Sequence, residues 1–269
     1  MRPLTYTGSR ILITGASSGL GVEFARRLAA RGADLVLVAR REERLRALAD
    51  DIEAEHGVSA AVVAMDLAEP GAGAALRERL EAEGLRITGL VNNAGFGYSG
   101  ALHHADADRT RAMVQLNVDT LVDLTCTFLD DLRSARSGAI LVNIASLAAF
   151  QPNPGLAVYG ATKAFVLNFS EALWEESRAA GLRVLALCPG PTSTEFFEVA
   201  GEAAGAGLPR MEAGEVVESA LRALDRRHPP ASVVPGALNT AASIATKRLL
   251  PTALVARTVG AMMRRGQGA

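Results

Sequence analysis

The chain has 269 residues, of which 49% are hydrophobic and 21% are charged. This usage is close to that of ordinary globular proteins and argues against a disordered chain or a coiled coil. The 28 basic and 29 acidic residues give a formal net charge of −1, so there is no overall attraction to nucleic acid or anionic lipid. The two cysteines, Cys126 and Cys188, cannot form a disulfide framework, and no spacing indicates a zinc site. We expect a protein without a metal.

Residues 1–8 lack the apolar core of a targeting signal. No uninterrupted apolar stretch reaches the roughly 18 residues that a membrane-spanning helix needs. We therefore expect a soluble, cytoplasmic protein.

Apolar runs that are typical of strands alternate with helical patterns along most of the chain. Strands are predicted at residues 10–14, 34–39, 60–65, 87–92, 138–145, 182–188 and 231–234. Helices are predicted at residues 19–31, 41–56, 73–83, 106–132, 156–180 and 213–226. This alternation predicts an α/β fold with three α/β/α layers, in which a doubly wound, Rossmann-like parallel sheet of about seven strands has the order 3-2-1-4-5-6-7.

One domain accounts for the chain, because no internal repeat or linker divides it. Residues 1–235 are expected to form a dinucleotide-binding catalytic domain. Within it, residues 191–212 are rich in Gly, Thr, Ala and Phe without clean periodicity. This stretch is too long for a routine connection and indicates a mobile segment or lid.

The C-terminal extension, residues 236–269, differs in character. No acidic residue occurs after residue 228, whereas five basic residues do: Lys247, Arg248, Arg257, Arg264 and Arg265. Apolar residues between them predict one or two amphipathic helices that break near Pro251. Such helices would cover the domain or an oligomer partner; alternatively, they would form the lip of an apolar substrate site or contact a membrane surface.

A glycine-rich stretch, TGASSGLG at residues 14–21, lies between the first strand and the first helix. Glycines at such a turn let backbone N–H groups approach a pyrophosphate, which the positive end of the helix also favours. The strand–turn–helix context therefore predicts a nucleotide site. Its expected contacts are Gly15, Ser17, Ser18, Gly19, Leu20 and Gly21.

In dinucleotide-binding domains, residues at the end of the second strand contact the adenosine ribose. An acidic residue there would accept from the 2′-hydroxyl and repel a 2′-phosphate. This chain has Ala39 followed by Arg40 and Arg41, and guanidinium groups pair well with phosphate. NADP(H) is therefore favoured over NAD(H), although the two arginines would also suit the start of a solvated helix.

Further motifs complete a resemblance to a known family. Residues 14–21 resemble the TGxxxGxG turn of the short-chain dehydrogenases/reductases, and residues 92–95 (NNAG) resemble the motif after their fourth strand. Asn117, Ser146, Tyr159 and Lys163 match their Asn–Ser–Tyr–Lys tetrad. Pro189 and Gly190 match their PG turn, and the resemblance covers residues 8–235.

The resemblance implies a catalytic role for the tetrad. Tyr159 and Lys163 are four residues apart on a predicted helix and share a face. An ordinary phenol has a pKa of about 10, and we expect the neighbouring ammonium and an oxidised nicotinamide to lower the pKa of Tyr159. Tyr159 would then act as general acid or base. The resemblance implies that Lys163 binds the nicotinamide ribose and that Ser146 donates a hydrogen bond to the substrate oxygen. It also implies that Asn117 holds a water molecule behind Lys163.

Additional cofactor contacts are implied by the resemblance along the other strand ends. Asp66 and Leu67 would contact the adenine, although Asp66 also suits a plain helix cap. Thr192 and Thr194 would lie against the nicotinamide carboxamide. The remaining expected contacts are Asn92, Ala94, Gly95, Tyr159, Lys163, Pro189 and Gly190.

Apolar side chains near these strand ends predict an apolar or aromatic substrate. The expected lining is Phe96, Leu147, Phe150 and Phe196, although aromatic residues of the lid would equally suit packing on another subunit. We predict a reversible NADP(H)-dependent reduction of a ketone or aldehyde to an alcohol. Alternatives are a non-catalytic NADPH sensor and a membrane-surface reductase of lipid-like carbonyls. The resemblance also implies a homodimer or homotetramer that packs through the helices at residues 106–132 and 156–180.

Overall fold

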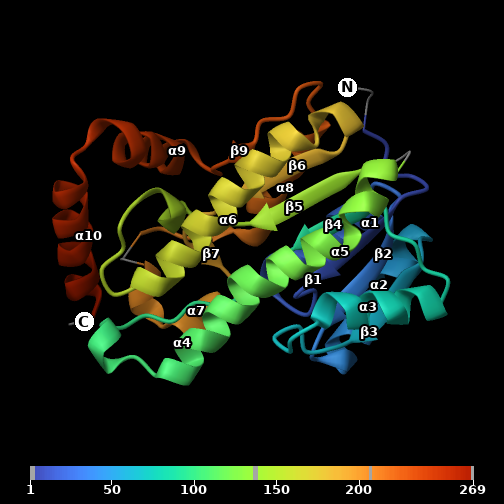
Figure 1. Ribbon diagram of the computed structural model, residues 1–269, viewed down its shortest axis with the longest axis horizontal. Helices are drawn as coiled ribbons and strands as arrows, with labels where there is room; N and C mark the ends of the chain where they lie inside the picture. The colour runs from blue at the N-terminus through green and yellow to red at the C-terminus, as the bar shows by residue number, and fades with distance from the viewer. Residues whose placement is uncertain (1–3, 136–138, 206–207, 268–269) are drawn as a thin grey trace.

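The computed structural model of the chain describes residues 4–135, 139–205 and 208–267. Seven parallel strands form one sheet in the order β3-β2-β1-β4-β5-β6-β9 (Figure 1). The strands are β1 (Arg10–Thr14), β2 (Asp34–Ala39), β3 (Ala60–Ala64), β4 (Gly89–Asn92), β5 (Ile140–Ile144), β6 (Arg183–Leu187) and β9 (Ser232–Val233). The predicted order is confirmed, with β9 as the seventh strand.

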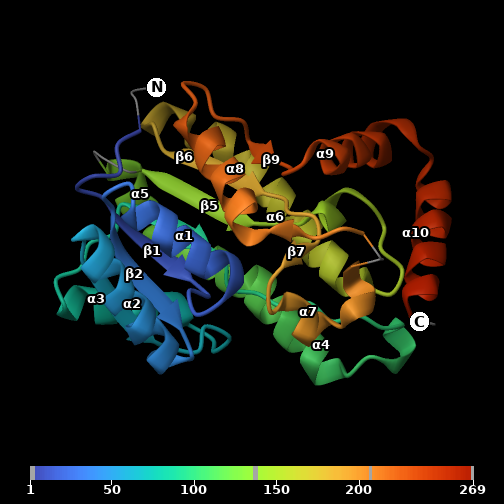
Figure 2. The same ribbon diagram turned by 180° about the vertical axis from the view of Figure 1, so that it is seen from behind.

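Helices cover both faces of the sheet, as Figures 1 and 2 show. One face carries α1 (Gly19–Ala29), α2 (Glu42–His56) and α8 (Ala213–Asp225), and the other carries α3 (Ala72–Ala82), α5 (Thr120–Ser134) and α6 (Ala157–Glu176). Strand side chains alternate between the two cores: Ile11 and Ile13 pack with the first set of helices and Leu12 with the second. Burial on both faces explains why the strands are apolar at nearly every position.

The sheet changes winding direction between β1 and β4. β1 pairs with β2 on one side and with β4 on the other, so the chain runs outward through β3 and returns to the centre. The connections after β1 and β4 leave the same edge in opposite directions. In parallel α/β sheets this arrangement leaves a crevice at the carboxyl ends of the strands, where ligands bind.

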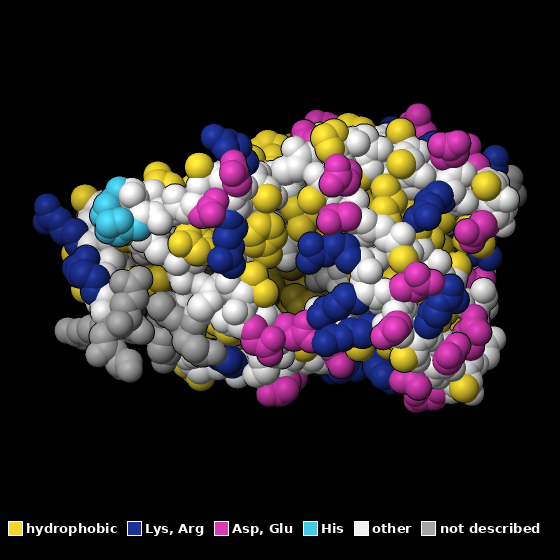
Figure 3. All heavy atoms as spheres, turned by 90° about the horizontal axis from the view of Figure 1, so that it is seen from below, with side chains coloured by type: hydrophobic (Ala, Val, Ile, Leu, Met, Phe, Trp, Pro, Cys, Tyr) yellow, Lys and Arg dark blue, Asp and Glu magenta, His cyan; other side chains and the backbone are white. Residues whose placement is uncertain are grey.

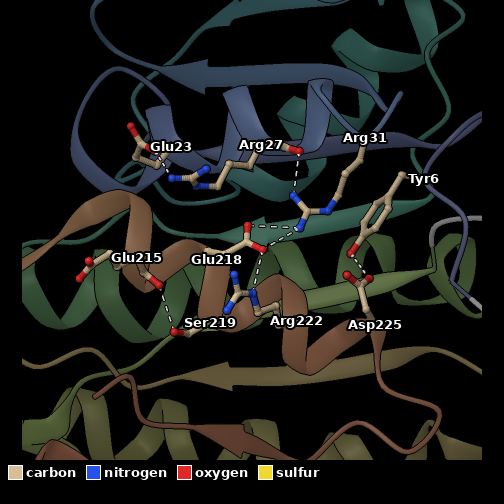
Figure 4. A network of polar contacts seen from close by, with 9 residues as sticks. All are labelled: Tyr6, Glu23, Arg27, Arg31, Glu215, Glu218, Ser219, Arg222 and Asp225. Atoms are coloured by element: carbon tan, nitrogen blue, oxygen red, sulfur yellow. Dashed lines mark hydrogen bonds and ion pairs between the residues drawn. The ribbon is translucent and has the colours of Figure 1, made fainter. Parts of the chain in front are cut away.

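A polar network joins α8 to α1 and the start of the chain (Figure 4). Arg31 Nη2 donates to both carboxylate oxygens of Glu218, each at 3.3 Å, and Arg222 Nε donates to Glu218 Oε1 at 3.1 Å. The Tyr6 hydroxyl donates to Asp225 Oδ1 at 3.0 Å. Burial, followed by the Asp225 carboxylate, raises the pKa of Tyr6 above its usual range. These contacts fix the helix that follows residues 191–212 to the first βα unit.

The two long predicted helices each contain an irregular part. The first consists of α4 (Ala107–Val114), a π-helical turn (Gln115–Asp119) and α5. Asp106 caps α4, because its side chain accepts from the N–H groups of Asp108 and Arg109. The second consists of α6, followed by a 3-10 turn (Arg178–Ala180). Turns of the π type are frequent at functional sites.

Residues 191–212, expected to be an irregular lid, contain short regular elements. β7 (Thr192–Ser193) pairs in parallel with β8 (Met211–Glu212). Between them lie α7 (Phe196–Ala200) and a 3-10 turn (Glu202–Gly205). These pieces are too short to produce a periodic sequence pattern, which explains why the sequence did not predict them. We call this stretch the lid segment; residues 206–207 lie outside the described residues.

The C-terminal extension forms two helices, as predicted. They are α9 (Ala237–Ile244), which runs into a π-helical turn (Ala245–Leu249), and α10 (Thr252–Gln267). The break falls at Pro251, whose ring cannot continue the preceding helix. α10 stands at one end of the molecule, beyond the sheet, in both views (Figures 1 and 2). None of the helices in the described part of the chain is long and apolar enough to cross a bilayer.

Candidate active site

A cavity of about 810 Å³ runs along the carboxyl ends of the strands. Seen from below, the molecule has a hollow with a hydrophobic floor and with Lys and Arg side chains on its rim (Figure 3). Most of the predicted site residues line this cavity together. They are Gly15, Ser17, Ser18, Gly19, Leu20, Arg40, Arg41, Asp66, Leu67, Ala94, Gly95, Phe96, Ser146, Leu147, Tyr159, Lys163, Pro189, Gly190, Thr192, Thr194 and Phe196.

Three residues that were expected to contact the cofactor or the substrate do not line the cavity. Gly21 is packed under the turn, where a Cβ atom would come within 2.3 Å of the Gly15 carbonyl oxygen. Asn92 is buried, and its Nδ2 donates to Thr125 Oγ1 at 3.1 Å and Asn143 Oδ1 at 3.0 Å. Phe150 packs on a separate hydrophobic cluster, with its ring centroid 5.5 Å from the Nζ of Lys247. Gly21 and Asn92 thus support the site from below, and Phe150 faces away from it.

Asn93, which was not among the predicted contacts, takes the place expected for Asn92. It lines the cavity, and its Nδ2 donates to the carbonyl oxygens of Thr14 at 2.9 Å and Gly15 at 3.2 Å. Thr14 Oγ1 in turn accepts from the N–H groups of Asn93 and Ala94, both at 2.9 Å. These bonds lock the turns after β1 and β4 together across the switch in winding direction.

The glycine-rich turn has the shape of an anion cradle. Gly15 and Gly19 have φ values of +65° and +53°, which side-chain-bearing residues rarely adopt. A Cβ atom on Gly15 would meet Asn93 Nδ2 at 2.8 Å, and one on Gly19 would meet Thr194 at 3.0 Å. Ser18 is the N-cap of α1 but makes no side-chain capping bond to any described residue. The first N–H groups of the helix are therefore suited to a ligand phosphate.

The end of β2 has the charge that a phosphorylated ribose needs. Ala39 is buried, at 7% exposure, and supplies no carboxylate. The Arg40 side chain is 77% exposed, and its Nη1 lies 3.7 Å from Asp66 Oδ2. Asp66 also accepts from the N–H of Ala68 at 3.0 Å, within a turn. The N-cap of the next helix is Gly71, so Asp66 does not cap a helix. Arg40 is free to turn toward a ligand at this edge.

Arg41 is more constrained than Arg40. Its Nε donates to Ser17 Oγ at 3.1 Å, and its Nη1 donates to Glu195 Oε2 at 2.8 Å. Arg44 Nη1 donates to the other oxygen, Glu195 Oε1, at 2.6 Å. These two guanidinium groups hold the pKa of Glu195 below its usual range. Glu195 begins the helical part of the lid segment, so this ion-pair cluster ties the lid segment to the start of α2.

Tyr159, Lys163 and Ser146 meet where β5 ends against α6. Lys163 Nζ donates to the Ile144 carbonyl oxygen at 2.7 Å and lies 5.9 Å from the centroid of the Tyr159 ring. Burial lowers the pKa of Lys163 to about 8. Burial also raises the pKa of Tyr159 to about 12, and a hydrogen bond with Ser146 opposes part of that rise.

The direction of the Tyr159 shift differs from the expectation. We expected Lys163 and an oxidised nicotinamide to lower the pKa of Tyr159, whereas among the protein's own groups burial has the larger effect and raises it. The Lys163 ammonium donates to the strand carbonyl, so it contributes little to stabilising a phenolate. The spacing of the two residues predicted their proximity correctly, but not how deeply the chain buries them.

Asn117 lies in the π-helical turn, is 1% exposed, and is not part of the cavity lining. Its Oδ1 accepts from the N–H of Phe96 at 3.0 Å, and its Nδ2 donates to the Phe96 carbonyl oxygen at 2.9 Å and to Thr162 Oγ1 at 3.2 Å. A Cβ atom on Gly95 would be 2.8 Å from Asn117 Oδ1, so this glycine permits the close approach. The Asn117 side chain thus joins the loop after β4 to the helix that carries Tyr159 and Lys163.

The end of the cavity beyond Tyr159 is largely apolar. The Phe196 ring lies 5.5 Å from the Tyr159 ring, centroid to centroid. Tyr159 also belongs to a hydrophobic cluster with Met113, Leu156 and Met263. Residues that line this end but were not predicted are Arg109, Ala112, Leu116, Gln151, Asn153, Leu156, Val199, Leu208, Val259 and Met263.

Val259 and Met263 come from α10. Met263 is 4% exposed and packs in the cluster around Tyr159. Of the roles considered for the C-terminal extension, the structure therefore favours the one in which it forms the lip of an apolar substrate site. Apolar residues four apart at 255, 259 and 263 were the sequence signal, but the spacing did not reveal which surface they cover.

The fold and this group of residues define a Rossmann-type oxidoreductase, and comparison with known proteins agrees. Residues 9–204 match the family model for short chain dehydrogenase. Sulfoacetaldehyde reductase from Chromohalobacter salexigens is 38% identical over 187 residues, which cover 69% of this chain and 73% of that protein. The chain belongs to the short-chain dehydrogenase family and is an enzyme that interconverts carbonyl and alcohol groups.

Two solved structures are similar over nearly the whole chain. A short-chain dehydrogenase from Sphingobium yanoikuyae, in complex with NADPH, is 37% identical with a TM-score of 0.77, and the match covers 90% of this chain and 96% of that one. The bulky-bulky ketone specific alcohol dehydrogenase from Comamonas testosteroni is 33% identical with a TM-score of 0.72, and the match covers 90% and 95%.

Proposed function

We propose that this enzyme is an NADP(H)-dependent reductase of ketones or aldehydes with an apolar or aromatic body. The observation that carries the proposal is the position of Tyr159, which lines the cavity between the glycine-rich cradle and the apolar end. A carbonyl carbon placed there is within reach of both a dinucleotide and a buried proton donor.

Each polar side chain has a defined task in this proposal. Tyr159 donates its hydroxyl proton to the carbonyl oxygen, and Ser146 donates a hydrogen bond to the same oxygen, where negative charge develops. With a pKa of about 12, Tyr159 is protonated at neutral pH, which suits the direction of reduction. Lys163 orients the nicotinamide ribose, and Asn117 holds the loop after β4 in place. The reduced nicotinamide, when bound, supplies the hydride.

The cofactor preference rests on the end of β2. Arg40 is exposed there, and Ala39 replaces the acidic residue that would accept from a ribose 2′-hydroxyl. Arg41 is already engaged by Ser17 and Glu195, so Arg40 is the better candidate for pairing with a 2′-phosphate. The similar enzyme from Sphingobium yanoikuyae is described in complex with NADPH, in agreement with this assignment.

The apolar wall supports the proposed substrate class. Phe96, Leu147, Leu156, Phe196 and Met263 line the end of the cavity next to Tyr159. Among similar proteins, one is specific for bulky-bulky ketones and another is named for sulfoacetaldehyde. The family therefore accepts carbonyl compounds of different sizes, and the aromatic and aliphatic lining here favours the larger ones.

We also propose a homodimer or homotetramer in the cytoplasm. The expected contact surface is formed by the two long helical stretches at residues 106–132 and 156–180, which contain α4, α5 and α6. On α6, Phe165 is 41% exposed, and its ring stacks on Phe169 with centroids 5.8 Å apart. An exposed aromatic ring that stacks on a half-buried one along a long helix suits a subunit interface. Analytical ultracentrifugation of the wild type and Phe165→Ser tests this assignment, since an unchanged sedimentation coefficient would exclude α6 from the interface.

Absorbance of reduced nicotinamide tests the activity. Wild-type protein is expected to oxidise NADPH faster than NADH with aromatic and long aliphatic ketones. Tyr159→Phe should bind NADPH as the wild type does but lose turnover by a factor of roughly 10² or more. Tyr6→Phe, which removes another buried phenol oxygen outside the cavity lining, serves as the matched control. Undiminished turnover in Tyr159→Phe would remove this residue from the mechanism, and NADPH binding without turnover of any carbonyl would favour the sensor alternative.

A further inference from the structure

We propose that the substrate carries an anionic group remote from its carbonyl, and that Arg109 pairs with that group. This inference rests on the proposed function and assigns the apolar end of the cavity a charged subsite. Arg109 lies on α4 and lines the cavity together with Ala112 and Leu116. The subsite would take a carboxylate, a sulfonate or a similar oxyanion at the far end of an apolar body.

The position of Arg109 relative to Tyr159 follows from helix geometry. Met113, one turn further along α4, packs in the hydrophobic cluster that contains Tyr159. With a rise of 1.5 Å per residue, Arg109 lies about 6 Å before Met113 along the helix axis. Its guanidinium is therefore separated from the reacting oxygen by an apolar stretch formed by residues such as Leu156, Phe196 and Met263. A substrate would bridge this stretch with its apolar part.

The charge balance of the cavity leaves Arg109 available. Within the described part of the chain, the acidic side chains that line the cavity are Asp66 and Glu195. Both are close to arginines at the dinucleotide end, Asp66 to Arg40 and Glu195 to Arg41 and Arg44. The end of the cavity beyond Tyr159 thus has a guanidinium without a carboxylate among its described lining residues.

The acidic neighbours of Arg109 on its own helix are also engaged. Asp106 accepts through Oδ1 from the backbone N–H groups of Asp108 and Arg109, and the Arg109 charge helps to lower the pKa of Asp106. Asp108 forms an ion pair with Arg111 at 2.5 Å. No carboxylate in the described part of the chain forms an ion pair with Arg109 itself.

Two contacts hold the guanidinium in place without neutralising it. Nη2 donates to the Val199 carbonyl oxygen in the lid segment at 2.8 Å. The Cζ atom lies 4.6 Å from the centroid of the Tyr98 ring, in a cation–π contact. Guanidinium has five N–H donors, so several remain for a bidentate contact with an oxyanion. A cation that the protein orients in advance loses less entropy when the anion binds.

The test compares an aryl keto acid with its methyl ester, which differ mainly in charge. For each variant the ratio of kcat/KM for acid over ester is measured with NADPH, so any loss of folded protein cancels. The wild type is expected to prefer the acid at least tenfold. Arg109→Met should reduce this ratio by a factor of roughly 10 to 100, mainly through the KM of the acid. Arg109→Lys should retain part of it.

Arg111→Met is the matched control, because Arg111 is exposed on the same helix but does not line the cavity. Its ratio should equal that of the wild type, and added salt should weaken the preference for the acid. An acid-to-ester ratio that is the same in Arg109→Met and in the wild type would overturn the proposal. So would a wild type that prefers the ester.

Calorimetry separates this proposal from the proposed function. The keto acid is titrated into NADPH-loaded wild type and Arg109→Met, independently of turnover. Tighter binding to the wild type supports the anionic subsite, even if neither the acid nor the ester is reduced. In that case the proposed reaction is refuted and the anionic subsite is not. Equal binding to both proteins overturns the subsite, and turnover of the ester would then leave the proposed reaction intact.

Discussion

Asn117 gives a sharp test of whether this side chain supports the site or takes part in the chemistry. Asn117→Ala removes three hydrogen bonds of a buried side chain, two to the backbone of Phe96 and one to Thr162. Each bond contributes about 1 kcal/mol net, and the N–H and carbonyl of the half-buried Phe96 lose their partner. The expected loss in the free energy of unfolding is about 3 kcal/mol. For a chain of this size that corresponds to a drop in Tm of roughly 6–12 °C.

Urea and thermal unfolding measure this loss, with Asn168→Ala as the control. Asn168 is exposed on α6 and donates from Nδ2 to the Ala164 carbonyl oxygen of its own helix at 2.9 Å, so its removal should cost less than about 0.5 kcal/mol. Turnover of Asn117→Ala should also fall, because the loop after β4 would lose its link to α6. If Asn117→Ala keeps its stability within about 1 kcal/mol of wild type but loses turnover, the anchoring argument is refuted and a role in proton transfer is favoured.

Gly15 and Gly57 have the same φ of +65°, but only at Gly15 would an added Cβ atom meet another residue. Gly15→Ala should therefore weaken NADPH binding at least tenfold, by roughly 1.4 kcal/mol or more, whereas Gly57→Ala should leave NADPH binding unchanged. Equal dissociation constants for these two variants would contradict the cradle. Because burial lowers the pKa of Lys163 to about 8, against roughly 10.4 in an unfolded chain, the unfolded state holds more protons between these values. The free energy of unfolding should therefore rise with pH across that window by up to about 3 kcal/mol relative to Lys163→Met, as measured by urea unfolding. If the difference in unfolding free energy between the two proteins does not change with pH, Lys163 keeps its ordinary pKa. Glu195→Gln removes a carboxylate beside Arg41 and should tighten NADPH about fivefold relative to NADH, since a 2′-phosphate gains about 1 kcal/mol when a nearby negative charge is lost. An unchanged ratio of dissociation constants would place the phosphate away from Arg41.

The fold and about half of the residues that line the cavity could be predicted from the sequence. Strands that are buried on both faces must be apolar throughout, and the helices between them must have one apolar face, so the alternation appears directly in the chain. The glycine-rich turn was also predictable, because a φ of +65° at Gly15 depends on local backbone chemistry. Tyr159 and Lys163 share a helix face at a spacing that the sequence shows.

Contacts between residues that are far apart in the chain could not be predicted, because they form only when the chain folds. Arg41 and Glu195 are 154 residues apart, and their pairing leaves Arg40 as the more exposed guanidinium at the end of β2. Neighbours such as Asn92 and Asn93 were indistinguishable in sequence, yet one is buried beneath the sheet edge and the other joins two turns. Such choices depend on which side of the backbone meets another element.

The same holds for burial and for the C-terminal extension. The direction of the Tyr159 pKa shift depends on how completely the surrounding elements exclude water, and a pair spacing contains no information about that. The apolar spacing in α10 predicted an amphipathic helix but not the surface it covers, because many surfaces can bury the same stripe. Local periodicity and backbone preference are written in consecutive residues, whereas the wall of the substrate site is assembled from segments that meet only when the chain folds.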